Sequence, residues 1–296
     1  MTSIQQESVD RAMPAPAPPP GRRTRSNVRW GGFAWTIGAW AAGLFFFFPV
    51  LWMVLTGFKR EVDAASNPPT WLFTPVLDGY RQVFDRDITP YLLNSLMASV
   101  VSTLLVLLLA TPAAYALSIR PVGKWRDVLF FFISTKMLPA VAALLPIYLL
   151  VKELGMLDNI WTMVILYTSM NLPLAVWMMR SFLLEVPAAL VEAAAMDGAG
   201  LMMTIRRILL PIVAPGLAAT ALICFIFSWN EFFFAVNLTA TVSGTSPIFL
   251  VGFVTSEGLF LARLCAAATL VSLPVVLAGW IAQKQLVRGL SMGAVK

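Results

Sequence analysis

Long apolar runs, each of the length that crosses a lipid bilayer, dominate this sequence. About 20 apolar residues in a helix span the ~30 Å hydrocarbon core. Six runs of roughly this length or longer can be drawn, at 33–58, 90–118, 128–151, 160–179, 212–235 and 264–283. They lack the alternation of membrane β-barrel strands, so they indicate helices. Hydrophobic residues make up 59% of the chain and charged residues only 12%, which is unusual for a soluble domain. We therefore predict an all-α membrane protein with six transmembrane helices.

The N-terminal segment has a different composition. It carries the Pro-rich run MPAPAPPP at 13–20, and then several arginines before residue 30. Such a segment cannot bury enough apolar surface to fold alone. Residues 1–29 are therefore expected to form a disordered cytoplasmic tail, and residues 30–296 the transmembrane domain. A cleaved signal peptide is the alternative, but the next apolar stretch is too long for one and no A-x-A-like site closes it.

Lysine and arginine fall mainly on one side of the predicted spans, and short loops rich in these residues stay in the cytoplasm. With the tail inside, both termini are cytoplasmic. The outer segments offset their basic residues with acidic ones, among them Asp78, Asp85, Glu153 and Asp158. The net charge of +6 fits this topology and an attraction to anionic lipid, so it does not indicate nucleic-acid binding.

Several chemistries are disfavoured by the residues that the sequence lacks. The chain has no histidine, which removes His-based acid–base catalysis and His metal ligation. Its two cysteines, Cys224 and Cys265, lie in or beside apolar runs without C-x-x-C spacing and are expected to be buried small hydrophobes. No G-x-x-x-x-G-K-[ST] loop occurs, so the chain is not expected to hydrolyse ATP by that route. We expect no cofactor, metal site or enzyme activity in the chain itself.

The connection between the fourth and fifth runs, about 181–211, predicts a short helix at the cytoplasmic face. Pro187 suits a first helical position, PAALVEAAAMD continues with good helix formers, and Gly198 can take the left-handed conformation that ends a helix. Ala193, Ala194 and Ala195 leave room for a partner surface to approach closely, and Glu192 offers one charge to it. This pattern predicts a docking surface.

Residues 192–211 read EAAAMDGAGLMMTIRRILLP. This stretch resembles the EAA loop of ATP-binding-cassette importer permeases, in which E-A-A, three residues, G, nine residues and I-x-L-P follow one another. The matching residues are Glu192, Ala193, Ala194, Gly198, Ile208, Leu210 and Pro211. Asp197 lies inside the same stretch and is included in the expected coupling site. The resemblance implies that the EAA loop, 187–211, is a coupling segment that docks on an ATPase subunit.

The resemblance covers roughly residues 30–296 and is strongest to the carbohydrate-uptake, maltose-type branch. It rests on NSLMAS at 94–99, TPAAYALSIR at 111–120, LPIYLL at 145–150, SWNEFFFAVNLT at 228–239 and QKQLVRGLSMGAVK at 283–296. It implies a second permease subunit, a dimer of ATPase subunits that binds ATP and Mg²⁺, and an external solute-binding protein or lipoprotein. By the same resemblance, the outer loop 237–258 would contact the binding protein and the C-terminal tail 284–296 would lie near the ATPase. The solute would be a sugar or polyol, and the resemblance places the protein in the inner membrane of a bacterium.

Four residues are candidates for lining the translocation path. Lys136 lies about eight residues into the third run, roughly 12 Å deep at 1.5 Å per residue, where a charge faces a protein interior or a wet cavity. Path lining and pairing with the second permease subunit are both open for it. Glu231 could snorkel to the interface or form a wall of the path, with Trp229 available to stack on a sugar ring and Asn230 to form hydrogen bonds. Prolines 139, 146 and 173 could break helices near the path or serve packing alone.

The main alternative class is a secondary transporter driven by an ion gradient. Such proteins usually show inverted repeats and midplane carboxylates. The two halves of this chain show no obvious repeat, and Glu231 is the one candidate acid in its apolar runs. A membrane-embedded enzyme is a weaker alternative, because no nucleophile–base pair or metal cluster is evident. The ATP-driven importer is therefore the favoured hypothesis.

Overall fold

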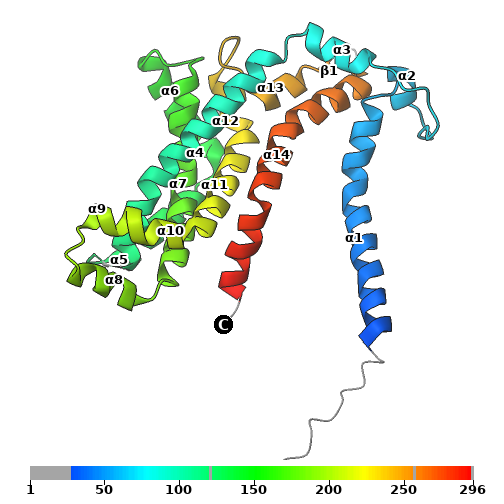
Figure 1. The fold of residues 1–296 in the computed structure, drawn as a ribbon. Coiled ribbons are helices and arrows are strands. Elements are labelled where there is room, and N and C mark those ends of the chain that lie inside the picture. The colour runs from blue at the N-terminus through cyan, green and yellow to red at the C-terminus, as the bar shows by residue number, and fades with distance from the viewer. Residues whose placement is uncertain (1–27, 120–121, 256–257, 295–296) are drawn as a thin grey trace, which may run out of the picture. The chain divides into compact units, whose positions relative to one another are not determined.

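The computed structural model describes residues 28–119, 122–255 and 258–294, and helices make up most of them (Figure 1). The predicted tail lies almost entirely outside the described residues. In chain order the elements are α1 (Val28–Thr56), α2 (Glu61–Ala64), α3 (Asp78–Asp85), α4 (Thr89–Ser118), α5 (Trp125–Met137), α6 (Ala140–Glu153), α7 (Ile160–Leu184), α8 (Ala188–Met196), α9 (Leu201–Met203), the π-helix η1 (Thr204–Leu209), α10 (Leu210–Ile212), α11 (Ala214–Trp229), α12 (Phe233–Leu238), α13 (Ser246–Val251), β1 (Val254–Thr255), β2 (Gly258–Leu259) and α14 (Leu261–Ala294).

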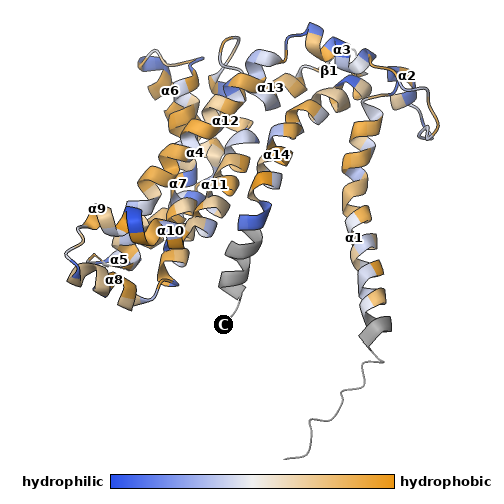
Figure 2. Ribbon diagram, in the orientation of Figure 1, coloured by the Kyte–Doolittle hydropathy of each residue, from blue (hydrophilic) through white to orange (hydrophobic). Residues whose placement is uncertain are grey.

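The structure divides at Val50 into two compact units, and the N-terminal unit contains the first part of α1. This part is apolar on every side (Figure 2). Its large side chains are exposed, including Trp35, Trp40 and Phe45. A helix that is apolar all round suits a lipid environment or a buried position, so this part agrees with the predicted first span.

The second unit, from Leu51 onward, contains every candidate span of the described residues except the first part of α1. Four helices in the described residues are long and apolar enough to cross a membrane, namely Trp35–Thr56 in α1, α4, α7 and Leu261–Gln285 in α14. Two further candidates are bent pairs, α5 with α6 at 91° and the segment Leu201–Ile212 with α11 at 83°. The all-α membrane fold is confirmed, with six spans if each bent pair is one span.

The structure refines the predicted third and fifth runs. The third run extends over 128–151 in the prediction, with Pro139 as a possible helix break, and Pro139 does separate α5 from α6. The residue before a proline is pushed out of the helical region, and Leu138 has an extended ψ of 124°. Pro146 and Pro173 instead lie inside α6 and α7. The fifth span ends at Trp229, six residues before its predicted end at 235.

Polar side chains join the three central helices of the second unit. α4 packs against α7 and α11. At their contact the Asn171 amide of α7 donates a 3.0 Å hydrogen bond to Ser228 Oγ of α11. Ser228 Oγ lies 3.2 Å from Ser102 Oγ of α4, and all three residues are buried. Hydrogen bonds of this kind between helices help to hold membrane bundles together.

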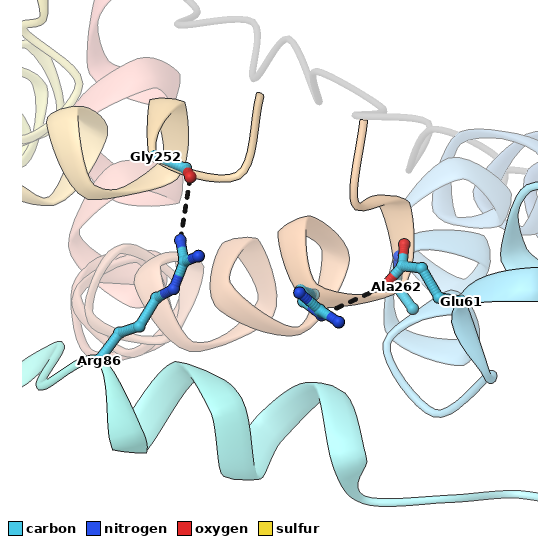
Figure 3. Close-up of polar contacts among 5 residues, drawn as sticks. Glu61, Arg86, Gly252 and Ala262 are labelled. Atoms are coloured by element: carbon cyan, nitrogen blue, oxygen red, sulfur yellow. Dashed lines mark hydrogen bonds and ion pairs between the residues drawn. The ribbon is translucent and has the colours of Figure 1, made fainter. Parts of the chain in front are cut away.

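Charged residues fix the end of the second unit that carries α2, α3 and α13 (Figure 3). Glu61 Oε1 accepts a 2.9 Å hydrogen bond from the Ala262 amide in the first turn of α14, where the helix dipole favours a carboxylate. Glu61 also lies 3.6 Å from the Arg263 guanidinium. Arg86 donates to the Gly252 carbonyl at 2.9 Å. Polar residues collect at α2 and α3 accordingly (Figure 2).

Gly216 allows α11 to approach α7 closely. A Cβ at this position would lie 2.3 Å from Cγ of Phe182, so the ring would have to move. We expect Gly216→Ala to destabilise the protein by about 1–3 kcal/mol, as overpacking of a filled core does. Gly279→Ala is the matched control, because Gly279 is also helical and a Cβ there meets nothing within 4 Å. Thermal unfolding of the purified variants in detergent measures both effects. Equal melting temperatures for the two variants would contradict this account.

Candidate functional site

The EAA segment folds as a short helix with a defined end. α8 begins at Ala188, with Pro187 as its N-cap, one residue later than predicted. Gly198 has a φ of +74°, a conformation that glycine adopts without steric cost. The Ala199 amide donates to the Ala194 carbonyl at 2.9 Å, and the Gly198 amide to the Ala195 carbonyl at 3.1 Å. These two bonds form a Schellman motif, so the predicted helix end at Gly198 is confirmed.

α8 packs one face against the rest of the second unit and leaves its other face exposed. Val191 is half-buried and Ala194 is 4% exposed, three residues apart and thus on the same face. Glu192, Ala193 and Ala195 are exposed, together with Asp197 and Met196. Of the three alanines expected to face a partner, Ala194 therefore faces the protein interior. Glu192 makes no hydrogen bond or ion pair with the described residues, which leaves its carboxylate free for a partner.

A π-helical turn lies between α8 and α11. Residues Thr204–Leu209 form η1, and Pro211 follows two residues later in α10. Proline cannot donate the backbone hydrogen bond of a continuous α-helix, and single π turns are a common local adjustment. Ile208 and Leu210 are half-buried and Pro211 is exposed. The motif thus occupies the turn that leads from the EAA helix into α11.

A buried apolar cluster joins this turn to the ends of two spans. Its members are Ala114 and Tyr115 of α4, Met179 and Leu183 of α7, and Val186, Ile205, Leu209 and Val213. Val191 of α8 and Leu210 of α10 pack against it. We call this set the coupling cluster. Because protein interiors are close-packed and transmit strain, a displacement of α8 would reach α4, α7 and α11 through it.

Lys136 lies in the last turn of α5, just before the bend at Pro139. Its side chain is exposed and lines two cavities of about 510 and 500 Å³. The larger one is also lined by Thr135 and Ser169. Among the residues that the structure describes, Lys136 has no ion-pair or hydrogen-bond partner. Both predicted roles, in the path and toward a second subunit, agree with this position.

The outer loop 237–258 contains the last two residues of α12, together with α13 and β1, and its first turn is bound to the side chain of Asp158. The Asp158 carboxylate accepts four backbone hydrogen bonds from Ala240, Thr241, Val242 and Ser243, with distances of 2.8 to 3.0 Å. The Ser243 hydroxyl donates to the Asp158 carbonyl at 2.9 Å, and the Asp158 amide donates to the Leu238 carbonyl at 2.9 Å. We call this arrangement the Asp158 clamp.

The clamp changes the acidity of its own carboxyl group. Burial acts to raise the pKa of Asp158, but the backbone N–H groups of the loop outweigh it and hold this pKa below its ordinary value. A lowered pKa means that the ionised form is favoured by folding. The clamp therefore stabilises the loop at every pH above the ordinary pKa of aspartate, and this stabilisation is lost as the pH falls through the lowered value.

Residues of α4 hold the other side of the same loop. The Asn94 amide donates to the carbonyls of Val242 at 2.9 Å and Gly244 at 3.1 Å. Ser95 Oγ accepts a 2.7 Å hydrogen bond from the Ser246 amide. The NSLMAS stretch that carried part of the resemblance thus has a structural function at the loop.

Known proteins similar to this chain identify its family. Residues 106–291 match the family of binding-protein-dependent transport system inner membrane components. The chain belongs to this family. A probable ABC transporter permease protein of Sinorhizobium fredii, y4oR, is 40% identical over 275 residues, which are 93% of this chain and 97% of that protein. The diacetylchitobiose uptake system permease protein DasC of Streptomyces coelicolor is 32% identical over 253 residues, 84% of this chain and 91% of that protein.

A solved structure agrees with the fold of this permease. A chain of a bacterial ABC transporter involved in the import of the acidic polysaccharide alginate superposes with a TM-score of 0.69 and 22% sequence identity. The match covers 87% of this chain and 97% of that chain. The family confirms the predicted importer permease and the inner-membrane location, and it decides against an ion-driven secondary transporter.

Trp229 and Asn230 of the permease are engaged with their own chain. Trp229 is 2% exposed, and its indole N–H donates to the Val271 carbonyl of α14 at 3.1 Å. Its ring packs in a core with Phe225 and Phe253, so in this structure the ring is covered by its own chain and is not open to a sugar. The Asn230 amide donates to Ile226 at 2.8 Å, although its side chain stays exposed.

Glu231 binds the start of α12. Its carboxylate oxygens accept hydrogen bonds from the Phe234 amide at 2.9 Å and the Ala235 amide at 3.2 Å. The side chain is half-buried. A carboxylate at a helix N-terminus satisfies amides that have no partner within the helix. This geometry gives Glu231 a local structural role beside the two roles weighed from the sequence.

Substitution of Glu231 measures how much its hydrogen bonds to the N-terminus of α12 contribute to stability. We expect Glu231→Ala to lower the free energy of unfolding by about 0.5–2 kcal/mol, the usual effect of losing a helix cap. Glu231→Gln should cost less, because its amide oxygen can still accept a hydrogen bond. Thermal unfolding in detergent and uptake by the assembled importer are measured for both. If Glu231→Gln abolishes uptake at normal stability, a role in the path is the better account.

Proposed function

We propose that this permease is one of two membrane-spanning subunits of an ATP-driven importer for a sugar or polyol. A dimer of ATPase subunits binds ATP and Mg²⁺ on the cytoplasmic side, and an external solute-binding protein or lipoprotein delivers the solute. Both termini of the permease are cytoplasmic. The permease itself has no catalytic site and converts closure of the ATPase dimer into a change of access.

The exposed face of α8, with its inner face in the coupling cluster, is the observation that supports this proposal most. Glu192, Ala193 and Ala195 are available to an ATPase surface, whereas Ala194 and Val191 anchor the helix to the spans. Force on the exposed face is transmitted to the ends of α4 and α7 by side chains in contact. The bend beside Val213, where the chain turns by 83° into α11, is a place where that movement can change a span's direction.

The relatives support the solute class. The Streptomyces coelicolor relative is a permease for diacetylchitobiose, and further relatives are permeases for trehalose in Mycobacterium tuberculosis, 30% identical, and for sulfoquinovosyl glycerol in Agrobacterium fabrum, 31% identical. Each of these named solutes carries sugar hydroxyls. A hydroxylated solute is therefore the class we assign to this importer.

The coupling role of α8 is tested with two substitutions. Removing one partner of an interfacial charge pair costs about 2–5 kcal/mol, so Glu192→Ala should weaken assembly with the ATPase or misalign it. Gly198→Val should have the larger effect, because a β-branched residue is strongly disfavoured at a φ of +74°. We expect both to lower solute uptake per ATP hydrolysed in the reconstituted complex while the permease still inserts.

A matched control separates coupling from folding. Gly200→Ala changes a nearby glycine with a φ of −69° and open space for a Cβ, so it should retain wild-type uptake. Insertion of every variant is quantified in isolated membranes. If Glu192→Ala and Gly198→Val support ATP hydrolysis and import at wild-type rates, α8 is not the coupling helix.

Lys136 is proposed to line the translocation path, where its charge can donate hydrogen bonds to solute oxygens. Loss of a hydrogen bond from a charged group is worth about 1.5–3 kcal/mol, so Lys136→Met should lower uptake by roughly tenfold or more with assembly intact. Lys152→Met, at the exposed end of α6, is the control and should leave uptake unchanged. Loss of assembly in Lys136→Met would instead indicate a charge on the second permease subunit.

A further inference from the structure

We propose that Asp158 is a positioning residue that fixes one part of the outer loop, from Thr239 to Thr245, in the shape that the solute-binding protein recognises. This inference rests on the proposed function, since it assigns one surface of the importer to one of its partners. The tip of the loop, Ala240–Val242, makes the contact. Asp158 acts through the tip, whose backbone amides its carboxylate binds.

The clamp has the geometry of a backbone anion site whose anion is the protein's own Asp158 carboxylate. Four successive N–H groups, from Ala240 to Ser243, point at one carboxylate. Runs of backbone amides that converge in this way form concave sites for anions. A loop of this shape would not keep its amides together without the anion, because unpaired amides facing one another repel. Asp158 therefore determines the conformation of the loop as well as anchoring it.

The loop is held at its base and open at its tip. Ser243, Thr245 and Ser246 are buried, and the Asn94 amide donates hydrogen bonds to the carbonyls of Val242 and Gly244. In contrast Ala240 and Thr241 are exposed, and the Val242 side chain is 71% exposed. A small, uncharged tip on a fixed base can enter a partner's surface without desolvating a charge. Its preformed shape also removes the cost of ordering a loop on binding.

The position of the loop indicates which partner it meets. Within the second unit, α12 and α13 lie at the opposite end of the central helices from α8 and α9 (Figure 1). If α8 docks on the ATPase at the cytoplasmic face, this loop faces the side from which a binding protein delivers solute. A charge-free tip also disfavours lipid headgroups, which attract basic clusters.

The experiment uses the assembled importer in lipid nanodiscs with purified binding protein and its solute. ATP hydrolysis is measured against binding-protein concentration for wild type, Asp158→Ala and Asp158→Asn. We expect Asp158→Ala to raise the half-saturating concentration of binding protein by about tenfold, because the loop must then be ordered on contact. The maximal rate and the rate without binding protein should stay near wild type. Asp158→Asn should lie between the two, because its amide oxygen can accept only part of the four hydrogen bonds.

Hydrogen exchange of the peptide that covers 239–245 gives the readout on the clamp itself. We expect the amides of Ala240–Ser243 to lose protection in Asp158→Ala and to lose part of it in Asp158→Asn. Glu153→Gln is the matched control: it removes a carboxylate that is exposed at the end of α6 and has no hydrogen bond to the loop in the described residues. It should change neither the exchange nor the half-saturating concentration.

A second variant tests the tip without touching the clamp. Val242→Asp places a charge on the exposed side chain and should raise the half-saturating concentration while the amides stay protected. The inference is overturned if Asp158→Ala exposes the amides and binding protein still stimulates at the wild-type concentration, or if the amides stay protected. If wild type itself shows no stimulation by any solute-loaded binding protein, the proposed function fails rather than the clamp.

Discussion

In the proposed coupling, movement of α8 is carried into the membrane-spanning helices by side chains that are already in contact, and the coupling cluster supplies them. Its residues come from α4, α7, η1 and the residues beside α11, so one packed group joins three spans to one short helix. The Arg180 guanidinium strengthens the same end, since it donates to the Leu117 carbonyl at 3.1 Å and lies 4.6 Å from the centre of the Trp125 ring. α5 is thereby tied to α4 and α7 near the point where force arrives.

The polar contacts deeper in the second unit limit how that movement can proceed. Ser102, Asn171 and Ser228 link α4, α7 and α11 by buried hydrogen bonds, and breaking them in an apolar interior leaves donors unsatisfied. These three helices should therefore move largely as one body. The bends at Pro139 and Val213 lie outside this group and are the places where α6 and the EAA segment can change direction relative to it. Rigid groups that turn about short breaks are a common form of conformational change.

The sequence predicted those features that depend on local patterns. The spans follow from apolar length, and the helix end at Gly198 follows from the need for a residue that tolerates positive φ. The Asp158 clamp could not be predicted, because its bonds join residues 82 to 85 positions apart and an Asp before a helix usually indicates only a local cap. Trp229 resembled a sugar platform because it precedes two polar residues, but packing from α14 buries its ring. The bend angles depend on tertiary packing, which proline positions alone do not specify.

The two ends of the central helices are built from different interactions, and the difference suits different tasks. α8 is held by apolar side chains, whose contacts are non-directional and can be exchanged for similar ones as the helix shifts. The outer loop is held by hydrogen bonds with defined directions, four of them to one carboxylate, and these bonds weaken steeply when their geometry changes. An element that transmits force benefits from contacts that allow small displacements. A surface that must be recognised by a separate protein benefits from a single fixed shape, and this contrast is the physical reason to assign motion to the α8 end and recognition to the loop.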